Sequence, residues 1–130
     1  MHVVTYDIFD KYVTEGINAI PKEFRKEFNN LAFVIENYPT PYQQRKIAMR
    51  KGSIIFGLYE GVPLQRRNSG YTGVLPDKIS IFKKPIEYFS RDEEHLRKIV
   101  KNTVWHEVAH HFGMNEAEVR KAERDRGHKY

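Results

Sequence analysis

The sequence predicts an α+β fold, in which short β-strands pack against helices and one long helix lies near the C-terminus. Helical spacing of apolar residues marks residues 5–20 and 91–112, and short apolar runs of strand length lie between them. The chain has 130 residues, of which 40% are hydrophobic and 30% charged. This length and composition suit one compact domain over residues 1–130.

The N-terminal segment has the pattern of an amphipathic helix. Thr5 is a suitable N-cap, and the helix is expected to run to about Ile20, where Pro21 ends it. Its apolar residues fall on one broad face: Ile8, Phe9, Tyr12, Val13, Gly16, Ile17 and Ile20. A second short helix is expected to hold Phe24 and Phe28.

Three apolar runs in the middle of the chain predict the strands of the sheet. Residues 31–35 and 53–59 are continuous apolar runs, whereas residues 78–82 alternate polar and apolar like a strand with one wet face. We expect residues 78–82 to form the edge of the sheet beside the long helix, with a short helix over 42–51. Residues 60–77 are rich in Gly and Pro and predict a long functional loop that limits access to the site.

Capping patterns mark the helices of the C-terminal third. Two pairs have the capping-box spacing: Ser90 with Glu93, and Asn115 with Glu118. The first pair predicts a helix over residues 91–112, which Gly113 would end in a left-handed conformation. The second pair predicts a last helix that ends at Gly127.

The net charge does not indicate a nucleic-acid-binding protein. There are 22 Lys and Arg residues against 17 Asp and Glu residues, which gives a net charge of +5. The basic excess is confined to residues 41–90, where Lys and Arg occur singly or in pairs. They do not alternate with aromatic residues as on a surface that binds single strands. A solvated basic face is therefore the simpler interpretation, and nucleic acid is not an expected partner.

The sequence also argues against membrane insertion and secretion. Apolar stretches such as residues 54–58 are far shorter than the roughly 20 residues that span a bilayer. Acidic residues interrupt the apolar pattern of residues 1–20, whereas a secretory signal has an uninterrupted apolar core. We therefore expect a cytoplasmic protein. The sequence contains 0 Cys, which excludes a disulfide framework and thiolate ligands. Any metal must therefore be bound by His, Asp or Glu.

The long predicted helix carries a His-Glu-x-x-His sequence formed by His106, Glu107 and His110. At about 100° per residue, the two histidines lie about 40° apart on one helix face, so both rings can reach one zinc ion. Glu107 would not be a ligand. It would act as the general base that takes a proton from the attacking water and later passes it to the leaving amine.

A catalytic zinc site usually has three protein ligands, so a third must come from elsewhere. Glu116 is the best candidate, because a left-handed Gly113 would reverse the chain just after His110 and turn it back toward the ion. Glu118 is the weaker candidate, because it is expected to cap the next helix.

The remaining histidines and Trp105 are assigned structural roles. Ideal helix geometry turns His111 toward the apolar face, which predicts a buried, hydrogen-bonded core histidine. Trp105 is expected to pack against another surface of the helix. His2, His95 and His128 are expected at the protein surface.

The sequence resembles the minimal zincins, which are small single-domain bacterial proteins similar to zinc metallopeptidases. The resemblance covers most of the chain and rests on four segments: residues 57–64 with Arg67 nearby, 75–79, 84–86 and 103–113. It implies a small mixed sheet against the active-site helix, and a metzincin-like site that matches His106, His110 and Glu116. The usual third histidine of metzincins is Glu116 here, and Met114 lies inside the ligand loop rather than in a separate methionine turn.

The expected function is that of a zinc-dependent metallopeptidase-like hydrolase that cleaves peptide bonds of short or unfolded peptides. Zn²⁺ is the expected cofactor, a peptide or protein the expected substrate, and Glu107 the catalytic residue. A partner for the oxyanion is required, and the weak candidates are Arg66, Arg67 and Tyr71.

Two alternative functions use the same residues. A metal-dependent nuclease would exploit the basic residues 41–90, and salt-dependent nucleic-acid binding would favour it. However, such a nuclease often needs several carboxylates or paired metals, which the sequence does not show. A non-catalytic zinc-binding or interaction module would bind metal without any hydrolysis.

Overall fold

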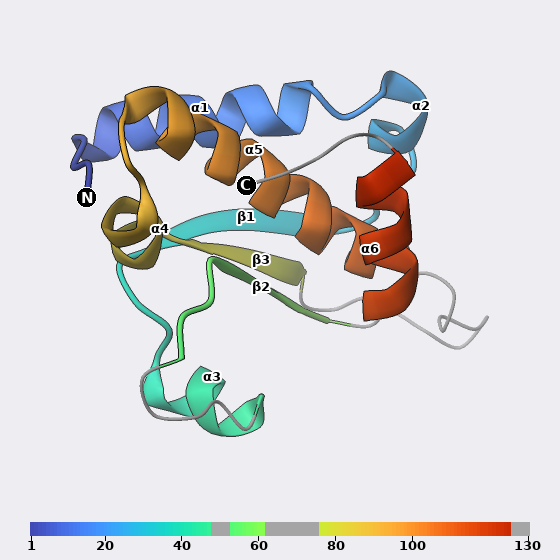
Figure 1. The fold of residues 1–130 in the computed structure, drawn as a ribbon. Helices are drawn as coiled ribbons and strands as arrows, with labels where there is room; N and C mark the ends of the chain where they lie inside the picture. The colour runs from blue at the N-terminus through green and yellow to red at the C-terminus, as the bar shows by residue number, and fades with distance from the viewer. Residues whose placement is uncertain (48–52, 62–75, 126–130) are drawn as a thin grey trace.

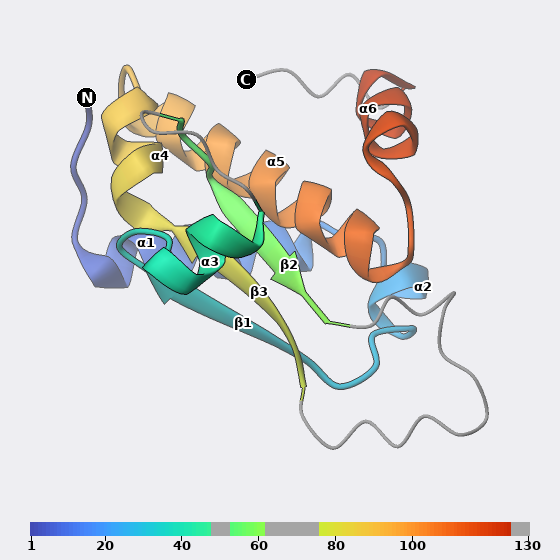
Figure 2. The same ribbon diagram turned by 90° about the horizontal axis from the view of Figure 1, so that it is seen from below.

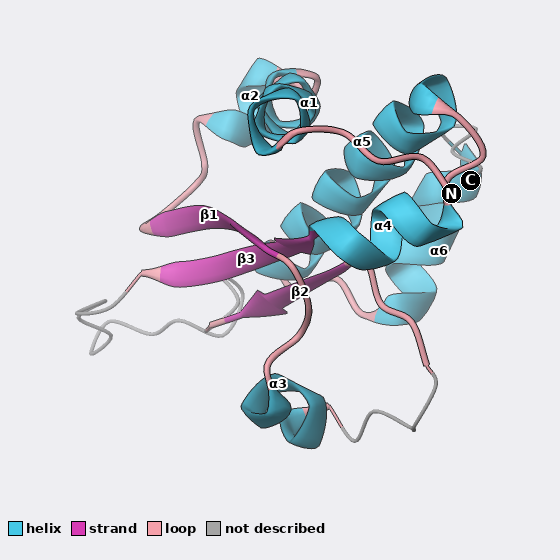
Figure 3. Cartoon of the chain, turned by 90° about the vertical axis from the view of Figure 1, so that its left-hand side faces the viewer, coloured by secondary structure: helices cyan, strands magenta, loops and turns pink. Residues whose placement is uncertain are grey.

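The computed structural model describes residues 1–47, 53–61 and 76–125 and confirms the predicted α+β class (Figure 1). Its elements are α1 (Tyr6–Asn18), α2 (Lys22–Arg25), β1 (Leu31–Glu36), α3 (Pro41–Lys46), β2 (Gly57–Glu60), β3 (Asp77–Phe82), α4 (Lys83–Phe89), α5 (Glu93–His111) and α6 (Glu116–Asp125). Helices α1 and α5 lie side by side on one face of the sheet, and α3 lies on the opposite side (Figure 3).

The sheet has the strand order β1-β3-β2, with β1 parallel and β2 antiparallel to β3. The prediction that residues 78–82 form an edge is therefore wrong, because β3 is the central strand and β2 is the edge beside α5. The sequence predicts that the polar residues alternating along β3 face water, but in the structure they contact polar side chains. Ser80 is fully buried and its hydroxyl donates to Glu36 Oε1 at 3.3 Å, while the Lys78 amine lies 3.3 Å from the same oxygen. The polar side of β3 thus faces polar partners.

Helix α3 covers that polar face, as the view from its side shows (Figure 2). Thr40 and Gln43 form a capping box, which explains why the helix begins at Pro41. The buried Gln43 side chain donates to Glu60 Oε1 at 2.9 Å and lies 3.5 Å from Ser80 Oγ. The short helix expected over 42–51 thus ends at Lys46, and residues 48–52 lie outside the described part of the chain.

The opposite face of β3 forms the core with α1 and α5. Ile79 and Ile81 are fully buried, as expected for the apolar positions of the strand. Helix α1 begins as predicted, with the Thr5 hydroxyl accepting from Ile8 N at 3.3 Å. Gly16 lets α1 approach α5 closely, because a Cβ there would lie 3.3 Å from Val104 Cγ2.

The start of α5 differs from the prediction. Asp92, rather than Ser90, is the N-cap, and its carboxylate accepts from His95 N at 2.8 Å. Ser90 instead ends α4, a helix that the sequence did not predict, and its hydroxyl donates to Ile86 O at 2.6 Å. His95 was expected at the surface but is 5% exposed, with Nδ1 accepting from Arg91 N at 3.0 Å. A helix just before α5 buries this junction.

The turn after α5 follows the prediction. Gly113 has φ 93°, and Met114 N donates to Ala109 O at 3.1 Å, so the chain reverses at once. Asn115 and Glu118 form the expected reciprocal pair, with bonds of 3.2 and 2.9 Å between backbone N–H and side-chain oxygen. Helix α6 is described to Asp125, and the predicted end at Gly127 lies beyond the described residues.

None of the helices in the described ranges is both long enough and apolar enough to cross a membrane.

Candidate functional site

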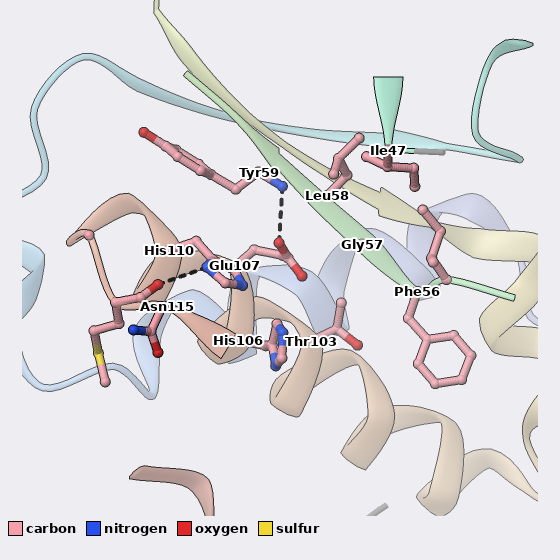
Figure 4. Close-up of a pocket in the computed structure, with 13 residues that line it drawn as sticks. Ile47, Phe56, Gly57, Leu58, Tyr59, Thr103, His106, Glu107, His110 and Asn115 are labelled. Atoms are coloured by element: carbon pink, nitrogen blue, oxygen red, sulfur yellow. Dashed lines mark hydrogen bonds between the residues drawn. The ribbon is translucent and has the colours of Figure 1, made fainter. Parts of the chain in front are cut away.

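A pocket of about 580 Å³ lies between strand β2, helix α5 and the turn that follows α5 (Figure 4). It is lined by Ile47, Ile55, Phe56, Gly57, Leu58, Tyr59, Thr103, His106, Glu107, His110, Gly113, Met114 and Asn115. All three residues of the His-Glu-x-x-His sequence are among them. The strand contributes Leu58, Tyr59 and backbone, whereas the helix contributes His106, Glu107 and His110.

His106 and His110 face the pocket one helical turn apart. Both are partly exposed, and their ring centroids lie 5.1 Å apart with an interplanar angle of 68°. Two imidazoles at this spacing can bind one metal ion from the same side of a helix.

The turn after α5 fixes the tautomer of His110. Its Nδ1 lies 2.9 Å from the carbonyl oxygen of Met114, which is brought there by the left-handed Gly113. A carbonyl can only accept, so Nδ1 carries the proton and donates. Nε2 is then the nitrogen that can coordinate a metal, in the arrangement usual for metal-binding histidines.

Glu107 is nearly buried, with an exposed fraction of 7%, and its carboxylate is held by strand β2. Its Oε1 accepts from the backbone N–H of Tyr59 at 3.0 Å (Figure 4). The strand reaches this carboxylate because of Gly57, where a Cβ would lie 2.7 Å from Thr103 Cγ2 and 3.2 Å from Glu107 Cγ. The sequence therefore needs glycine at this position for β2 to contact α5.

The third predicted ligand, Glu116, is the first residue of α6 and follows the pocket-lining Asn115. Its side chain lies outside the described part of the structure. Among the side chains that are described, no group of three or more His, Cys, Asp or Glu residues could hold a metal ion. Glu118 caps α6, as predicted, through its bond to the amide of Asn115.

His111 lies behind the pocket and is fully buried, which confirms its assignment to the core. Its Nδ1 is 3.3 Å from Asp77 Oδ2, and Asn29 N donates to its Nε2 at 3.5 Å. Trp105 is 9% exposed and packs, as expected.

Two residues near the site were missed by the sequence interpretation as functional groups. Tyr59 contacts Glu107 through its backbone, and Asp77 contacts Tyr59 and His111. Both belong to segments on which the family resemblance rests, and this was the available signal. The oxyanion candidates Arg66, Arg67 and Tyr71 lie outside the described residues.

The donor set suits zinc better than magnesium or calcium. Two imidazoles share the pocket, and the tautomer of His110 directs an unprotonated Nε2 to act as the donor. Imidazole nitrogen with one carboxylate is a common zinc ligand set, whereas magnesium and calcium prefer oxygen ligands. The residues present therefore fit a zinc ion.

Comparison with known proteins identifies a family and a solved structure of similar fold. The sequence model of a family described as zincin-like metallopeptidase matches residues 28–126. No curated protein matches the chain. A solved structure of a conserved hypothetical protein from Thermus thermophilus is similar with a TM-score of 0.56, and the match covers 94% of this chain and 99% of that chain. At 19% sequence identity, this likeness concerns the fold alone.

Proposed function

Since the chain belongs to the zincin-like metallopeptidase family, we propose that it is a zinc-dependent peptidase that cleaves short or unfolded peptides. The observation that carries the proposal is the convergence of His106, Glu107 and His110 on one pocket beside an edge strand. A helix that merely exposed two histidines would not need a nearly buried carboxylate between them, held by a backbone N–H.

We assign the metal ligands to His106, His110 and Glu116. Zinc bound there would polarise the scissile carbonyl and lower the pKa of a coordinated water toward about 7. The reversal of the chain at Gly113 supports this assignment in two ways. It places Met114 O where it orients His110, and it lets α6 begin at Glu116.

Glu107 is assigned as the general base. The Tyr59 N–H bond at Oε1 restricts rotation of the carboxylate and keeps it in the pocket. A water beside this carboxylate would give it a proton while the water oxygen bonds to the carbonyl carbon of the peptide. The same proton would then move to the leaving nitrogen as the carbon–nitrogen bond breaks.

The pocket lining favours peptides over nucleic acids. Among the residues that the structure describes, its apolar lining side chains are Ile47, Ile55, Phe56, Leu58 and Met114, and no Lys or Arg lines it. Besides the metal, a nucleic-acid substrate would need Lys or Arg contacts to its phosphate backbone, whereas an apolar side chain of a peptide would bury surface here. The pocket therefore supports the peptidase over the nuclease.

The test is a digest of a broad peptide library by the zinc-loaded protein, followed by mass spectrometry of the products. We expect cleavage next to apolar residues, loss of cleavage after chelation and its return when zinc is restored. A protein that binds zinc stoichiometrically but leaves the whole library intact would contradict the peptidase proposal and support the non-catalytic module.

A further inference from the structure

Tyr59 makes hydrogen bonds at two ends, and each bond reaches a different carboxylate. Its backbone N–H donates to Glu107 Oε1 at 3.0 Å, and its hydroxyl donates to Asp77 Oδ2. The ring between them packs edge-on against His111, with centroids 5.7 Å apart and an interplanar angle of 62°. One residue thus connects the pocket carboxylate to a buried polar cluster.

The bond to Glu107 depends on how strand β2 is rotated. At the end of β3, Phe82 N donates to the carbonyl oxygen of Phe56, the residue just before β2, at 2.8 Å. In an antiparallel pair, alternate residues direct their N–H groups toward the neighbour and away from it. Tyr59, three residues after Phe56, therefore directs its N–H outward from the sheet, where Glu107 accepts it. A change in the twist of β2 would turn this amide away.

The cluster that anchors the hydroxyl is itself fixed. Asp77 is 2% exposed, its N–H donates to Asn30 O at 2.8 Å, and its Oδ2 lies 3.3 Å from His111 Nδ1. Gly61 makes room for it, because a Cβ there would overlap the Asp77 carboxyl group. The hydroxyl of Tyr59 therefore meets an acceptor that cannot move easily.

We propose that Tyr59 is a positioning residue for Glu107, and that Asp77 and His111 anchor it. The proposal rests on the peptidase function assigned above. The anchored hydroxyl sets the orientation of β2, and the β2 amide then sets the orientation of the Glu107 carboxylate. General-base catalysis is sensitive to such placement, because misplacement of a catalytic group by about 1 Å can slow a reaction about a hundredfold.

The chain offers a matched control. The Tyr12 hydroxyl donates to Glu93 Oε2 at 2.6 Å, which is also a tyrosine–carboxylate bond between two elements. It joins α1 to α5 outside the pocket. Tyr12→Phe therefore removes the same kind of bond as Tyr59→Phe without touching the residues that orient Glu107.

The experiment measures hydrogen exchange of the residue-59 amide by NMR in Tyr59→Phe, Tyr12→Phe and Glu107→Ala. Loss of a charge-assisted hydrogen bond predicts exchange about tenfold faster at residue 59 in Tyr59→Phe, with no change there in Tyr12→Phe. Glu107→Ala should speed the same amide, and the double variant should add little, because both changes break one linked unit. Asp77→Ala, which removes the acceptor of the Tyr59 hydroxyl, makes the same test if Tyr59→Phe does not fold.

Kinetics give the second readout. For a peptide cleaved by the wild type, Tyr59→Phe should lower kcat about tenfold with KM and zinc content unchanged, whereas Tyr12→Phe should keep all three. Unchanged exchange at residue 59 in Tyr59→Phe would overturn the proposal, as would equal kcat values in the two Phe variants. If the wild type cleaves nothing, the peptidase assignment fails, and the exchange data still decide whether Tyr59 positions Glu107.

Discussion

Glu107 differs from the other acidic residues of α5 in its surroundings. Glu93 and Glu94, in the first turn, are exposed, where they complement the helix dipole. Glu107 is nearly buried, points into the pocket and accepts a backbone hydrogen bond. Burial of a carboxylate is costly, so its position beside two imidazoles calls for a function that surface glutamates do not have.

Glu107→Gln should therefore abolish hydrolysis while preserving the fold and zinc content. The amide keeps the shape and can still accept from Tyr59 N, but it cannot take a proton from water at neutral pH. We expect a fall in kcat of at least about a hundredfold, measured with a fluorogenic peptide chosen from the library digest. Glu94→Gln is the control, because it makes the same change on the same helix. Equal turnover by wild type and Glu107→Gln would remove Glu107 as the base.

At this scale, the sequence predicts well what depends on local spacing. His106, His110 and His111 fall where helix geometry places them, because a helix fixes the direction of each side chain relative to its neighbours. Tyr59 and Asp77 were missed, since they meet only through strand pairing between segments 18 residues apart. His95 was misplaced because the helix that buries it was not predicted.

At the scale of elements, the contact between β2 and α5 is set by Gly57. The register pairs Gly57 with Ile81, and the backbone there is so close to α5 that a side chain would meet Thr103 Cγ2, Ser80 O and Glu107 Cγ. The backbone position thus brings the Tyr59 amide within reach of the base.

Gly57→Ala should destabilise the protein by about 1–3 kcal/mol, because an added methyl group must displace packed atoms. Thr103→Ser should rescue part of this loss, since it removes Cγ2, the nearest contact at 2.7 Å, while a hydroxyl remains to donate to Ile99 O. Urea unfolding of the two single variants and the double variant measures the coupling. Strictly additive losses would show that Gly57 does not set this contact.

The junction of α4 and α5 predicts a pH dependence of stability. The pKa of His95 is lowered, chiefly because burial disfavours the charged ring and also because Arg91 is near. Since the unfolded chain binds the proton more readily, the His95 contribution is complete above about pH 6.5 and is lost as the pH falls through the lower folded pKa.

Thermal unfolding between pH 7.5 and 5.5 tests this, with His95→Asn as the variant that does not titrate. The wild type should lose more stability than His95→Asn over that interval.

The pKa of Glu87 is also lowered: burial opposes this, but the hydrogen bonds from Lys83 and Val4 N outweigh it. Its contribution is lost only at more acid pH, below the ordinary value of 4.5. If the stability of the wild type and that of His95→Asn change in parallel with pH, the role assigned to His95 is contradicted.

The strand order shows why sheet arrangement was harder to predict than strand location. All three strands were located, but alternation in residues 78–82 was interpreted as a wet edge. Ser80 and Lys78 instead meet Glu36 and α3. A polar face covered by polar partners and a polar face covered by water have the same sequence pattern, so the pattern alone does not determine which strand is central.

At the scale of the whole molecule, the proposed metal would join helix α6 to helix α5. Helix α6 follows α5 after a short turn, and within its described residues Val119 is the fully buried hydrophobic side chain. If Glu116 binds the same ion as His106 and His110, zinc links the start of α6 to α5 in addition to the turn at Gly113.

Zinc removal should therefore lower stability, and α6 should loosen before the core. Metal at about 100 times its dissociation constant adds about 2.7 kcal/mol to the free energy of unfolding, which for a chain of this size is a Tm change of roughly 5–10 °C. The measurements are thermal unfolding and hydrogen exchange with and without chelator. His110→Ala should have lost most of its zinc by elemental analysis, so chelator should barely affect it, whereas His2→Ala should behave like the wild type.

Thermal unfolding and hydrogen exchange together test whether Glu116 is a zinc ligand in addition to His106 and His110. Loss of protection in α6 on chelation, with the amides of β3 unchanged, indicates that the ion ties α6 to α5, as a ligand at Glu116 requires. A Tm that falls while α6 exchange stays constant would keep His106 and His110 as ligands and exclude Glu116. A ligand bound only by the folded state must raise the free energy of unfolding. If chelator removes the zinc but changes neither the Tm nor the hydrogen exchange of α6, the ion therefore does not stabilise this fold.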